Sequence, residues 1–227
     1  MAQDQWTAVD DYFTELLVNP NPTLDLVQEA CAAAGLPAIS VSPPQGKLLN
    51  LLARIRGARA ILEVGTLGGY STIWLARGMV PGGHLITLES DPKHAEVARA
   101  NIARAGLAAT VEVRCGLAMD SLRQIANEEG GPFDLIFIDA DKPGIPDYFS
   151  FALRLSRRGS VIVVDNVVRD GEVIDAASTD ASVQGVRRFM EMLRSESRVS
   201  ATAIQTVGTK GYDGFAIALV VAGAPDR

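Results

Sequence analysis

The sequence predicts an α/β fold: a doubly wound, mostly parallel sheet of seven strands with an antiparallel edge strand. Three features predict it. From residue 60 onward, short apolar runs alternate with helical patterns of about 10–15 residues, which is typical of parallel strands joined by helices. The runs at residues 133–138 and 160–165 are almost continuously apolar, as in strands buried on both faces. The last two runs flank a glycine-rich connection at residues 208–214, which favours a hairpin and therefore antiparallel pairing.

Helices are expected before this alternating pattern begins. Apolar residues recur at helical spacing, and the expected helices span residues 6–18, about 23–34 and 47–56. Asn21 or Thr23 can cap the second helix, and the segment beginning at Ser42 leads into the third. These helices either cover a substrate site or contact a partner subunit, and the sequence leaves both possibilities open.

The remaining elements alternate in order. Strands are expected at residues 60–64, 85–89, 110–114, 133–138, 160–165, 202–207 and 215–221, and helices at 70–79, 92–105, 117–128, 146–156 and 181–194, with a loop at 169–179. Asp91 followed by Pro92 is a typical helix start, because the carboxylate caps the helix and proline suits its first turn. No repeat or linker interrupts the pattern. We therefore expect a single domain over residues 1–227, with residues 1–57 as a helical N-terminal extension.

Composition narrows the class of protein. Apolar residues make up 48% of the chain and charged residues 21%, which is typical of a soluble globular protein. The net charge of −6 argues against nucleic acid as a partner. Cys31 and Cys115 form no C-x-x-C pair, which indicates a reducing compartment, and no signal peptide or membrane-spanning run is apparent. A cytoplasmic location without a membrane partner is the expectation.

Polar residues follow two of the buried strands. Asp139, Asp141 and Lys142 come directly after residues 133–138, and Asp165 with Asn166 ends the next strand. Ligands of open α/β sheets sit beyond the carboxyl ends of parallel strands. Two strands that deliver carboxylates to the same edge therefore predict a functional site.

A glycine-rich turn follows the first strand of the sheet. Glu63 precedes Gly65, and two more glycines come before Ser71, so the spacing differs from the G-x-G-x-x-G of dinucleotide-binding proteins. A carboxylate at this turn would repel a pyrophosphate but suits a cationic ligand. Glu89 ends the second strand, where an acid can bind the hydroxyls of a ribose. A cationic adenosine cofactor, S-adenosylmethionine, fits both features.

At these residues the chain resembles the metal-dependent class I O-methyltransferases of the catechol and caffeoyl-CoA type, which have a Rossmann-like fold. The resemblance covers residues 41–219, and its most specific parts are Leu62-Glu-Val-Gly65, Asp139-Ala-Asp-Lys142 and Asp165-Asn166. It implies that the cofactor is held by Val41, Glu63, Gly65, Ser71, Glu89, Ala118, Asp139 and Asp141. It also implies a metal held by Asp139, Asp165 and Asn166, with Lys142 as the base. Members of the family usually form homodimers, so a homodimer is implied as well.

The chemistry of these residues agrees with that resemblance. Two carboxylates and an amide oxygen form a set suited to Mg²⁺, although Ca²⁺ or Mn²⁺ would also fit. The two oxygens of a catechol could bind such an ion, which would favour loss of a hydroxyl proton. Lys142 could accept that proton if burial and the ion disfavour its charged form. The expected function is therefore metal-assisted methyl transfer to one hydroxyl of a small vicinal diphenol, whether a simple catechol, a flavonoid or a hydroxycinnamoyl acceptor.

Other interpretations remain open at this point. The chain could be a nicotinamide-dependent oxidoreductase on a similar sheet, or a protein that binds S-adenosylmethionine without catalysis. Asp165 and Asn166 could simply form a turn, and Lys142 could be a solvated or ligand-orienting charge. We expect neither histidine to take part in catalysis, and we expect Tyr148 to be a core or subunit contact rather than a substrate contact.

Overall fold

The computed structural model describes residues 2–222. Its strands form one seven-stranded sheet in the order β3-β2-β1-β4-β5-β7-β6. The strands are β1 (Ala60–Val64), β2 (His84–Glu89), β3 (Val111–Cys115), β4 (Phe133–Ile138), β5 (Ser156–Asp165), β6 (Val199–Gly208) and β7 (Gly211–Val220). The first five strands are parallel, and β7 pairs antiparallel with both β5 and β6. The predicted doubly wound sheet, with antiparallel pairing at one edge, is confirmed.

The order of the strands fixes where a ligand can bind. The chain runs outward from β1 through β2 to β3 and then returns to place β4 on the other side of β1. Val64 at the end of β1 pairs with Leu88 of β2 and with Ile138 of β4, so these three strands end level with one another. A crevice at the carboxyl ends of strands where the order reverses is the usual ligand site of such sheets.

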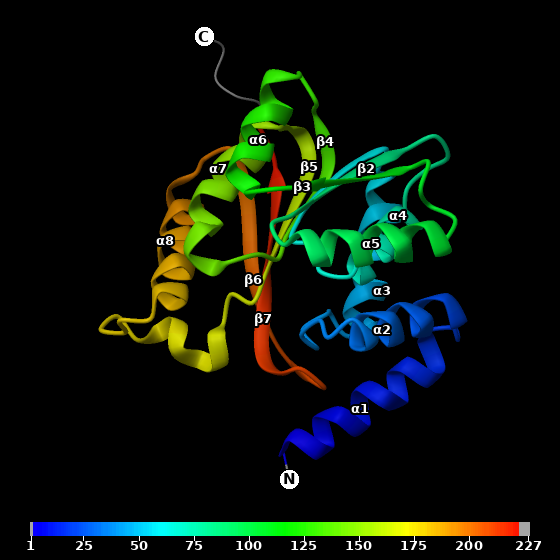
Figure 1. Cartoon of the computed structure of the whole chain (residues 1–227). Helices are drawn as coiled ribbons and strands as arrows, with labels where there is room; N and C mark the ends of the chain where they lie inside the picture. The colour runs from blue at the N-terminus through cyan, green and yellow to red at the C-terminus, as the bar shows by residue number, and fades with distance from the viewer. Residues whose placement is uncertain (1, 223–227) are drawn as a thin grey trace.

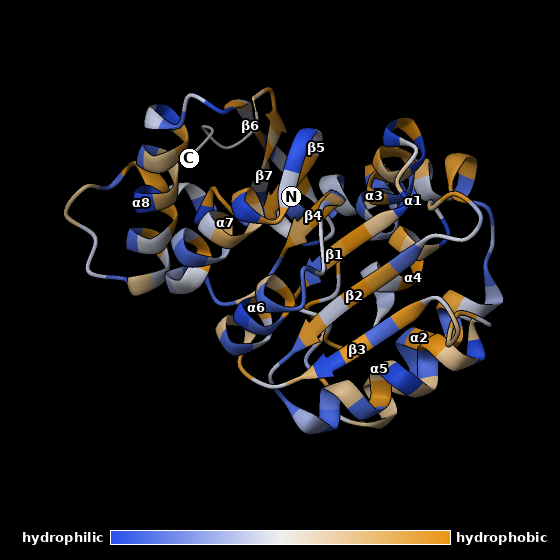
Figure 2. Ribbon diagram, turned by 90° about the horizontal axis from the view of Figure 1, so that it is seen from above, coloured by the Kyte–Doolittle hydropathy of each residue, from blue (hydrophilic) through white to orange (hydrophobic). Residues whose placement is uncertain are grey.

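Helices cover both faces of the sheet (Figures 1 and 2). On one face lie α2 (Pro22–Ala33), α3 (Pro43–Arg56), α4 (Tyr70–Ala76) and α5 (Pro92–Arg104), and on the other α6 (Ala118–Asn127), α7 (Ile145–Arg154) and α8 (Ala181–Ser195). Two short 3-10 helices follow β4 and β5, namely η1 (Lys142–Gly144) and η2 (Arg169–Ile174). None of the helices within residues 2–222 is long and apolar enough to cross a lipid bilayer.

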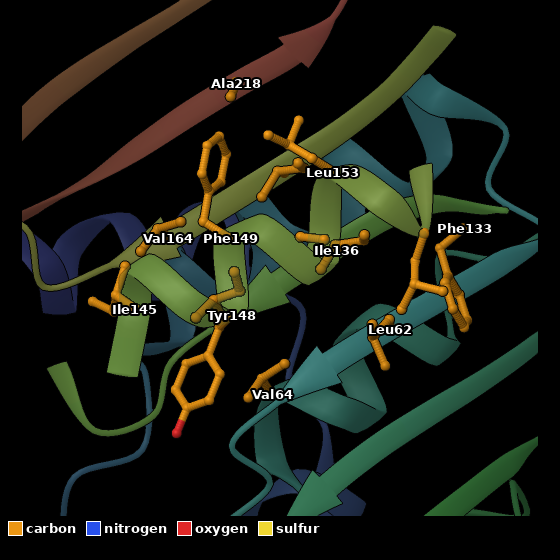
Figure 3. Packing of buried hydrophobic residues seen from close by; sticks show 14 of the residues in the cluster. Leu62, Val64, Phe133, Ile136, Ile145, Tyr148, Phe149, Leu153, Val164 and Ala218 are labelled. Carbon is orange, nitrogen blue, oxygen red and sulfur yellow. The ribbon is translucent and has the colours of Figure 1, made fainter. Parts of the chain in front are cut away.

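The apolar core has one cluster on each face. All six residues of β4 are buried, as expected for a central strand covered by helices on both sides. Figure 3 shows Phe149 of α7 lying over the sheet close to Val164 of β5. Phe149 also meets Phe189 of α8 edge to face, with ring centroids 5.1 Å apart. This packing holds the carboxyl ends of β4 and β5 in fixed positions.

The N-terminal segment is helical, as expected, but its three helices are not equally buried. The first, α1 (Ala2–Leu17), buries none of its side chains, and it is tied to the β6–β7 hairpin by Asp10, which accepts a hydrogen bond from the backbone N of Thr209 at 2.8 Å. Its exposed apolar residues are Val9, Tyr12, Phe13, Leu16 and Leu17. A homodimer stays a prediction.

Several element boundaries differ from the sequence-based expectation. The third helix begins at Pro43 rather than residue 47, because Ser42 caps it and the prolines occupy its first turn. The final connection is shorter than residues 208–214, because Gly208 already pairs with Gly211 and both strands extend to the turn. The expected loop at residues 169–179 begins with the short helix η2.

Candidate active site

A cavity of about 580 Å³ lies beyond the carboxyl ends of β1, β2 and β4. Its walls contain most of the side chains that the sequence predicted for the site: Val41, Gly65, Ser71, Glu89, Ala118, Asp139, Asp141, Lys142 and Asn166. Two predicted residues, Glu63 and Asp165, are buried next to this cavity rather than in its wall. The fold thus gathers residues that are up to 125 positions apart in the chain, from Val41 to Asn166.

Gly65 brings the turn after β1 against the turn after β4. Its φ is +102°, and a Cβ at this position would lie 2.0 Å from the backbone carbonyl O of Asp139. Any other residue would therefore clash with backbone as well as strain its own conformation. This contact joins the turn after β1 to the strand end that carries Asp139 and Lys142.

Glu63 is fully buried and accepts hydrogen bonds from three hydroxyl groups. The donors are Ser71 Oγ at 2.7 Å, Thr72 Oγ1 at 2.5 Å and Thr87 Oγ1 at 2.7 Å. Burial raises the pKa of Glu63 to about 7, although these hydrogen bonds favour the charged form. A direct contact between Glu63 and a ligand stays a prediction, because its carboxylate lies behind the cavity wall. Glu63 orients Ser71, which does line the cavity.

The raised pKa of Glu63 predicts how stability depends on pH. Between about 4.5 and about 7 the folded protein keeps this proton while the unfolded chain loses it, so the free energy of unfolding falls as pH rises through this range. The full effect is roughly 3 kcal/mol. Urea unfolding of wild type and Glu63→Gln at pH 5 and pH 8 measures it, because only wild type should lose this contribution. If wild type and Glu63→Gln lost the same stability between pH 5 and pH 8, the assignment would be contradicted. Glu191→Gln, which changes an exposed glutamate, is the control and should behave as wild type does.

Glu89 lies at the end of β2 with its carboxylate in the cavity wall. One oxygen accepts hydrogen bonds from the backbone N of Thr66 at 3.3 Å and of Leu67 at 2.7 Å, and the other accepts from the backbone N of Asp91 at 3.0 Å. These bonds hold the carboxylate in one orientation at the rim. His94 Nδ1 lies 3.7 Å from Glu89 Oε1.

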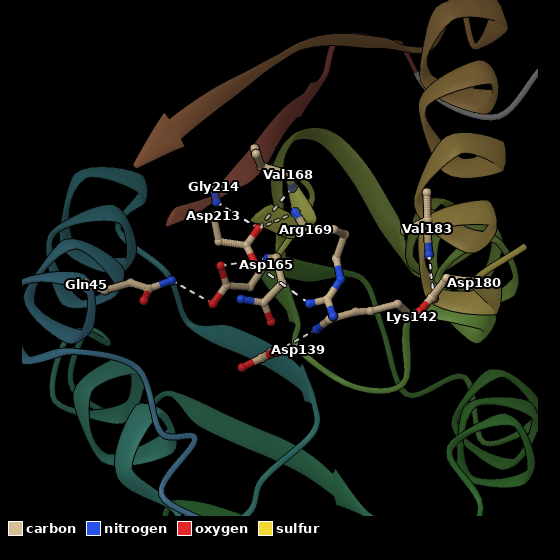
Figure 4. A network of polar contacts seen from close by, with 11 residues as sticks. Gln45, Asp139, Lys142, Asp165, Val168, Arg169, Asp180, Val183, Asp213 and Gly214 are labelled. Carbon is tan, nitrogen blue, oxygen red and sulfur yellow. Dashed lines mark hydrogen bonds and ion pairs between the residues drawn. The ribbon is translucent and has the colours of Figure 1, made fainter. Parts of the chain in front are cut away.

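Asp139 and Lys142 form an ion pair inside the cavity. Lys142 Nζ donates to Asp139 Oδ1 at 2.9 Å, and the lysine side chain is only 11% exposed. Figure 4 shows the pair in the same network as Asp165. Asp141 points to another partner, because it accepts hydrogen bonds from the Tyr148 hydroxyl and from the backbone N of Gly144. The two aspartates of this turn therefore have separate roles.

Asp165 is buried at the end of β5, with 5% of its surface exposed. Gln45 Nε2 of α3 donates to its Oδ2 at 2.6 Å, and the backbone N of Asn166 donates to its Oδ1 at 2.8 Å. Burial and the nearby charge of Asp139 raise the pKa of Asp165. Two carboxylates that repel each other in a partly buried site are stabilised by a cation between them.

These donors fit a divalent cation. Within residues 2–222 no group of three or more His, Cys, Asp or Glu side chains is arranged to hold a metal. A site here would therefore need the amide oxygen of Asn166 in addition to the carboxylates of Asp139 and Asp165. The backbone of Asn166 adopts φ +58°, a conformation that asparagine tolerates better than most residues. Two carboxylates and an amide form the hard oxygen set that Mg²⁺ binds through a few protein ligands, with water filling the remaining positions.

Sequence reasoning missed several residues that line the cavity. His94 lies in the wall, because the start of α5 passes over Glu89; that neither histidine takes part in catalysis stays a prediction. Tyr148 belongs to the core, as expected, but its hydroxyl also reaches Asp141 at the cavity. Arg169 lines the cavity too, although it lies in a segment expected to be a loop. Only tertiary contacts reveal these three.

A second, smaller cavity of about 260 Å³ adjoins the first at Asn166, which lines both. Asp165 and Gln45 lie in its wall together with Asp10 of α1 and the tip of the β6–β7 hairpin. The two cavities meet at the candidate cation ligands. This arrangement leaves space for one molecule on each side of that cluster.

Comparison with known proteins covers nearly the whole chain. A family profile described as O-methyltransferase matches residues 15–219. The catechol O-methyltransferase of Niastella koreensis is 56% identical over 213 residues, which make up 94% of this chain and 96% of that protein. The solved O-methyltransferase of Bacillus cereus in complex with SAH has a TM-score of 0.95 and 61% identity, covering 96% of this chain and 99% of that one. An O-methyltransferase of Streptomyces achromogenes involved in tomaymycin synthesis, solved with SAM, has a TM-score of 0.95 and 54% identity over 98% of this chain and 100% of that one.

Proposed function

The chain belongs to the O-methyltransferase family and is an S-adenosylmethionine-dependent O-methyltransferase; from this premise we propose that it methylates one hydroxyl of a small vicinal diphenol with the help of a divalent metal. One observation carries the proposal. The ion pair of Asp139 and Lys142 shares a cavity with the turn after β1 and with Glu89, and Asp165 lies buried beside it. The proposed cofactor site, the candidate metal ligands and the candidate base therefore lie next to one another.

The cavity suits an adenosine cofactor. Its volume of about 580 Å³ is within the range of ordinary ligand sites. We propose that Ser71 and Gly65 contact the amino-acid part, Glu89 the ribose and Ala118 the adenine, with Val41 and Asp141 as further contacts. The similar Bacillus cereus and Streptomyces achromogenes enzymes were solved with SAH and SAM, which supports this assignment. When bound, S-adenosylmethionine supplies an electrophilic methyl group.

The metal would be held by Asp139, Asp165 and Asn166. Mg²⁺ is the ion we propose, because its preferred ligands are oxygens and it leaves positions for water or substrate. When bound, it would supply positive charge that favours ionisation of a diphenol hydroxyl. Gln45 keeps one oxygen of Asp165 occupied and so fixes the orientation of that carboxylate. The protein's contribution is this fixed arrangement of negative charge.

Lys142 is the proposed base. It lies among the candidate metal ligands, and its side chain is 11% exposed, so a proton leaving the acceptor has a nearby nitrogen to move to. Its ion pair with Asp139 fixes the position of that nitrogen among the candidate ligands. The alignment of acceptor and cofactor beside Lys142 and Asn166 would then supply much of the rate.

The vicinal arrangement of the acceptor hydroxyls is directly testable. The purified protein is incubated with S-adenosylmethionine, Mg²⁺ and one of three acceptors, namely catechol, resorcinol or phenol, and products are identified by mass spectrometry. We expect methylation of catechol alone, because only its adjacent oxygens can both reach one ion. Equal methylation of resorcinol would contradict the acceptor assignment, and cofactor binding without methylation of any acceptor would contradict the proposed diphenol acceptor class.

A further inference from the structure

Arg169 is a positively charged residue of the cavity wall that has no role in the proposed reaction. It follows the candidate metal ligand Asn166 by three positions and begins η2. Its side chain lines the same cavity as Asp139, Lys142 and Asn166. Figure 4 shows it reaching toward the ion pair of Asp139 and Lys142.

The guanidinium of Arg169 has donors without acceptors. Its Nε is buried and has no hydrogen-bond partner within residues 2–222. The nearest acid is Asp213, whose Oδ2 lies 3.7 Å from Nη1, too far for a hydrogen bond. The other oxygen of Asp213 accepts from the backbone N of Val168, Arg169 and Gly214. The charge of Arg169 also acts on Asp180, which is at the surface.

The backbone holds this side chain in place. Arg169 has φ +56°, and Asp170 and Gly171 that follow have φ +55° and +90°. Left-handed conformations of non-glycine residues persist only where surrounding contacts fix them, and they gather at functional sites. Here the fixing contact is Asp213, which accepts hydrogen bonds from the backbone N of Val168 and Arg169 at the start of the turn. The left-handed turn thus directs into the cavity a guanidinium whose ion pair with Asp213 is long, at 3.7 Å, and whose buried Nε lacks a hydrogen-bond partner.

We infer that Arg169 binds an anionic substituent of the acceptor, so that the preferred substrate is a vicinal diphenol carrying a carboxylate. This inference rests on the proposed function. A guanidinium presents parallel donors that match the two oxygens of a carboxylate. Such a pair would give the buried Nε, or an Nη of the same group, a hydrogen-bond acceptor. The cofactor also carries a carboxylate. Arg169 lines the cavity together with Asn166 and Lys142, the proposed metal ligand and base. We therefore assign the bound carboxylate to the acceptor and not to the cofactor.

The test compares two acceptors that differ by one charge. Initial rates with 3,4-dihydroxybenzoate and with its methyl ester are measured for wild type, Arg169→Met and Arg169→Lys, and for Arg194→Met as a surface control. Arg169 already has positive φ, so methionine adds no backbone strain of its own. We expect Arg169→Met to lower kcat/KM for the acid by about 10- to 100-fold, mainly through KM, and to leave the ester within about 3-fold. Arg169→Lys should retain part of the preference.

Equilibrium binding gives a readout that does not depend on turnover. Calorimetric titration of 3,4-dihydroxybenzoate into protein saturated with S-adenosylhomocysteine and Mg²⁺ should show the same loss of affinity in Arg169→Met. Equal losses for acid and ester would overturn the inference, as would a wild type that does not prefer the acid. A raised KM for S-adenosylmethionine with an unchanged acceptor preference would assign Arg169 to the cofactor instead. Failure of wild type to methylate catechol and both test acceptors would count against the proposed function itself.

Discussion

Replacing Lys142 by alanine is expected to lower kcat for a vicinal diphenol by roughly 10²- to 10⁴-fold. The side chain is 11% exposed and its Nζ is 2.9 Å from Asp139, so no other described lysine can take its place in this cavity. The remaining activity should rise with pH, because the acceptor then ionises without a base. Initial rates between pH 6 and pH 10, for wild type and variant, measure both effects.

Lys142→Arg separates a base from a mere positive charge. Arginine keeps the charge and can still pair with Asp139, but it does not release its proton in a protein. If Lys142 is the base, the arginine variant should be as impaired as the alanine variant. Activity within about 10-fold of wild type in Lys142→Arg would show that Lys142 acts only through its charge. Lys93→Ala, on the surface of α5, serves as the control for charge loss.

Replacing Asp165 by asparagine is expected to remove most of the metal affinity. The loss should exceed the roughly 10–100-fold that removal of an outer-shell partner causes, because Asp165 is a proposed direct ligand. Metal-free Asp165→Asn should unfold at the same temperature as wild type or higher, because a buried carboxylate that faces the charge of Asp139 is removed. Competition with Mn²⁺ followed by electron paramagnetic resonance measures affinity, and thermal unfolding measures stability.

The stability measurement also distinguishes a ligand from a purely structural residue. At a Mg²⁺ concentration about 100 times Kd, wild type should gain roughly 2.7 kcal/mol, and Asp165→Asn should gain little at the same concentration. Glu191→Gln, at an exposed position of α8, should respond as wild type does. An unchanged Mn²⁺ affinity in Asp165→Asn would remove this residue from the metal site.

Much of the fold and the outline of the site could be predicted from local sequence patterns. β4 is buried on both faces, so all its residues except Asp134 are apolar, and its end is marked by the abrupt change at Asp139. Parallel strands bring their carboxyl ends to one edge, so Asp139 and Asp165 could be placed together without coordinates. The glycine-rich turn was recognisable because φ near +102° at Gly65 and its contact with Asp139 exclude a side chain.

The unpredicted part depends on contacts between distant segments. Gln45 reaches Asp165 across 120 positions, and no local pattern pairs an amide on α3 with the end of β5. The hydroxyls of Thr72 and Thr87 bind the carboxylate of Glu63 in the interior, and no local pattern pairs these three residues. Arg169 gave no signal, because its orientation depends on Asp213 in the final hairpin.

Metal-dependent methyl transfer is the central claim, and a chelation experiment tests it most directly. Protein freed of metal is assayed with S-adenosylmethionine and catechol, first with excess EDTA and then after Mg²⁺ is added beyond the chelator. We expect activity to disappear with EDTA and to return with Mg²⁺. Activity that is the same in both conditions would contradict the metal site at Asp139, Asp165 and Asn166.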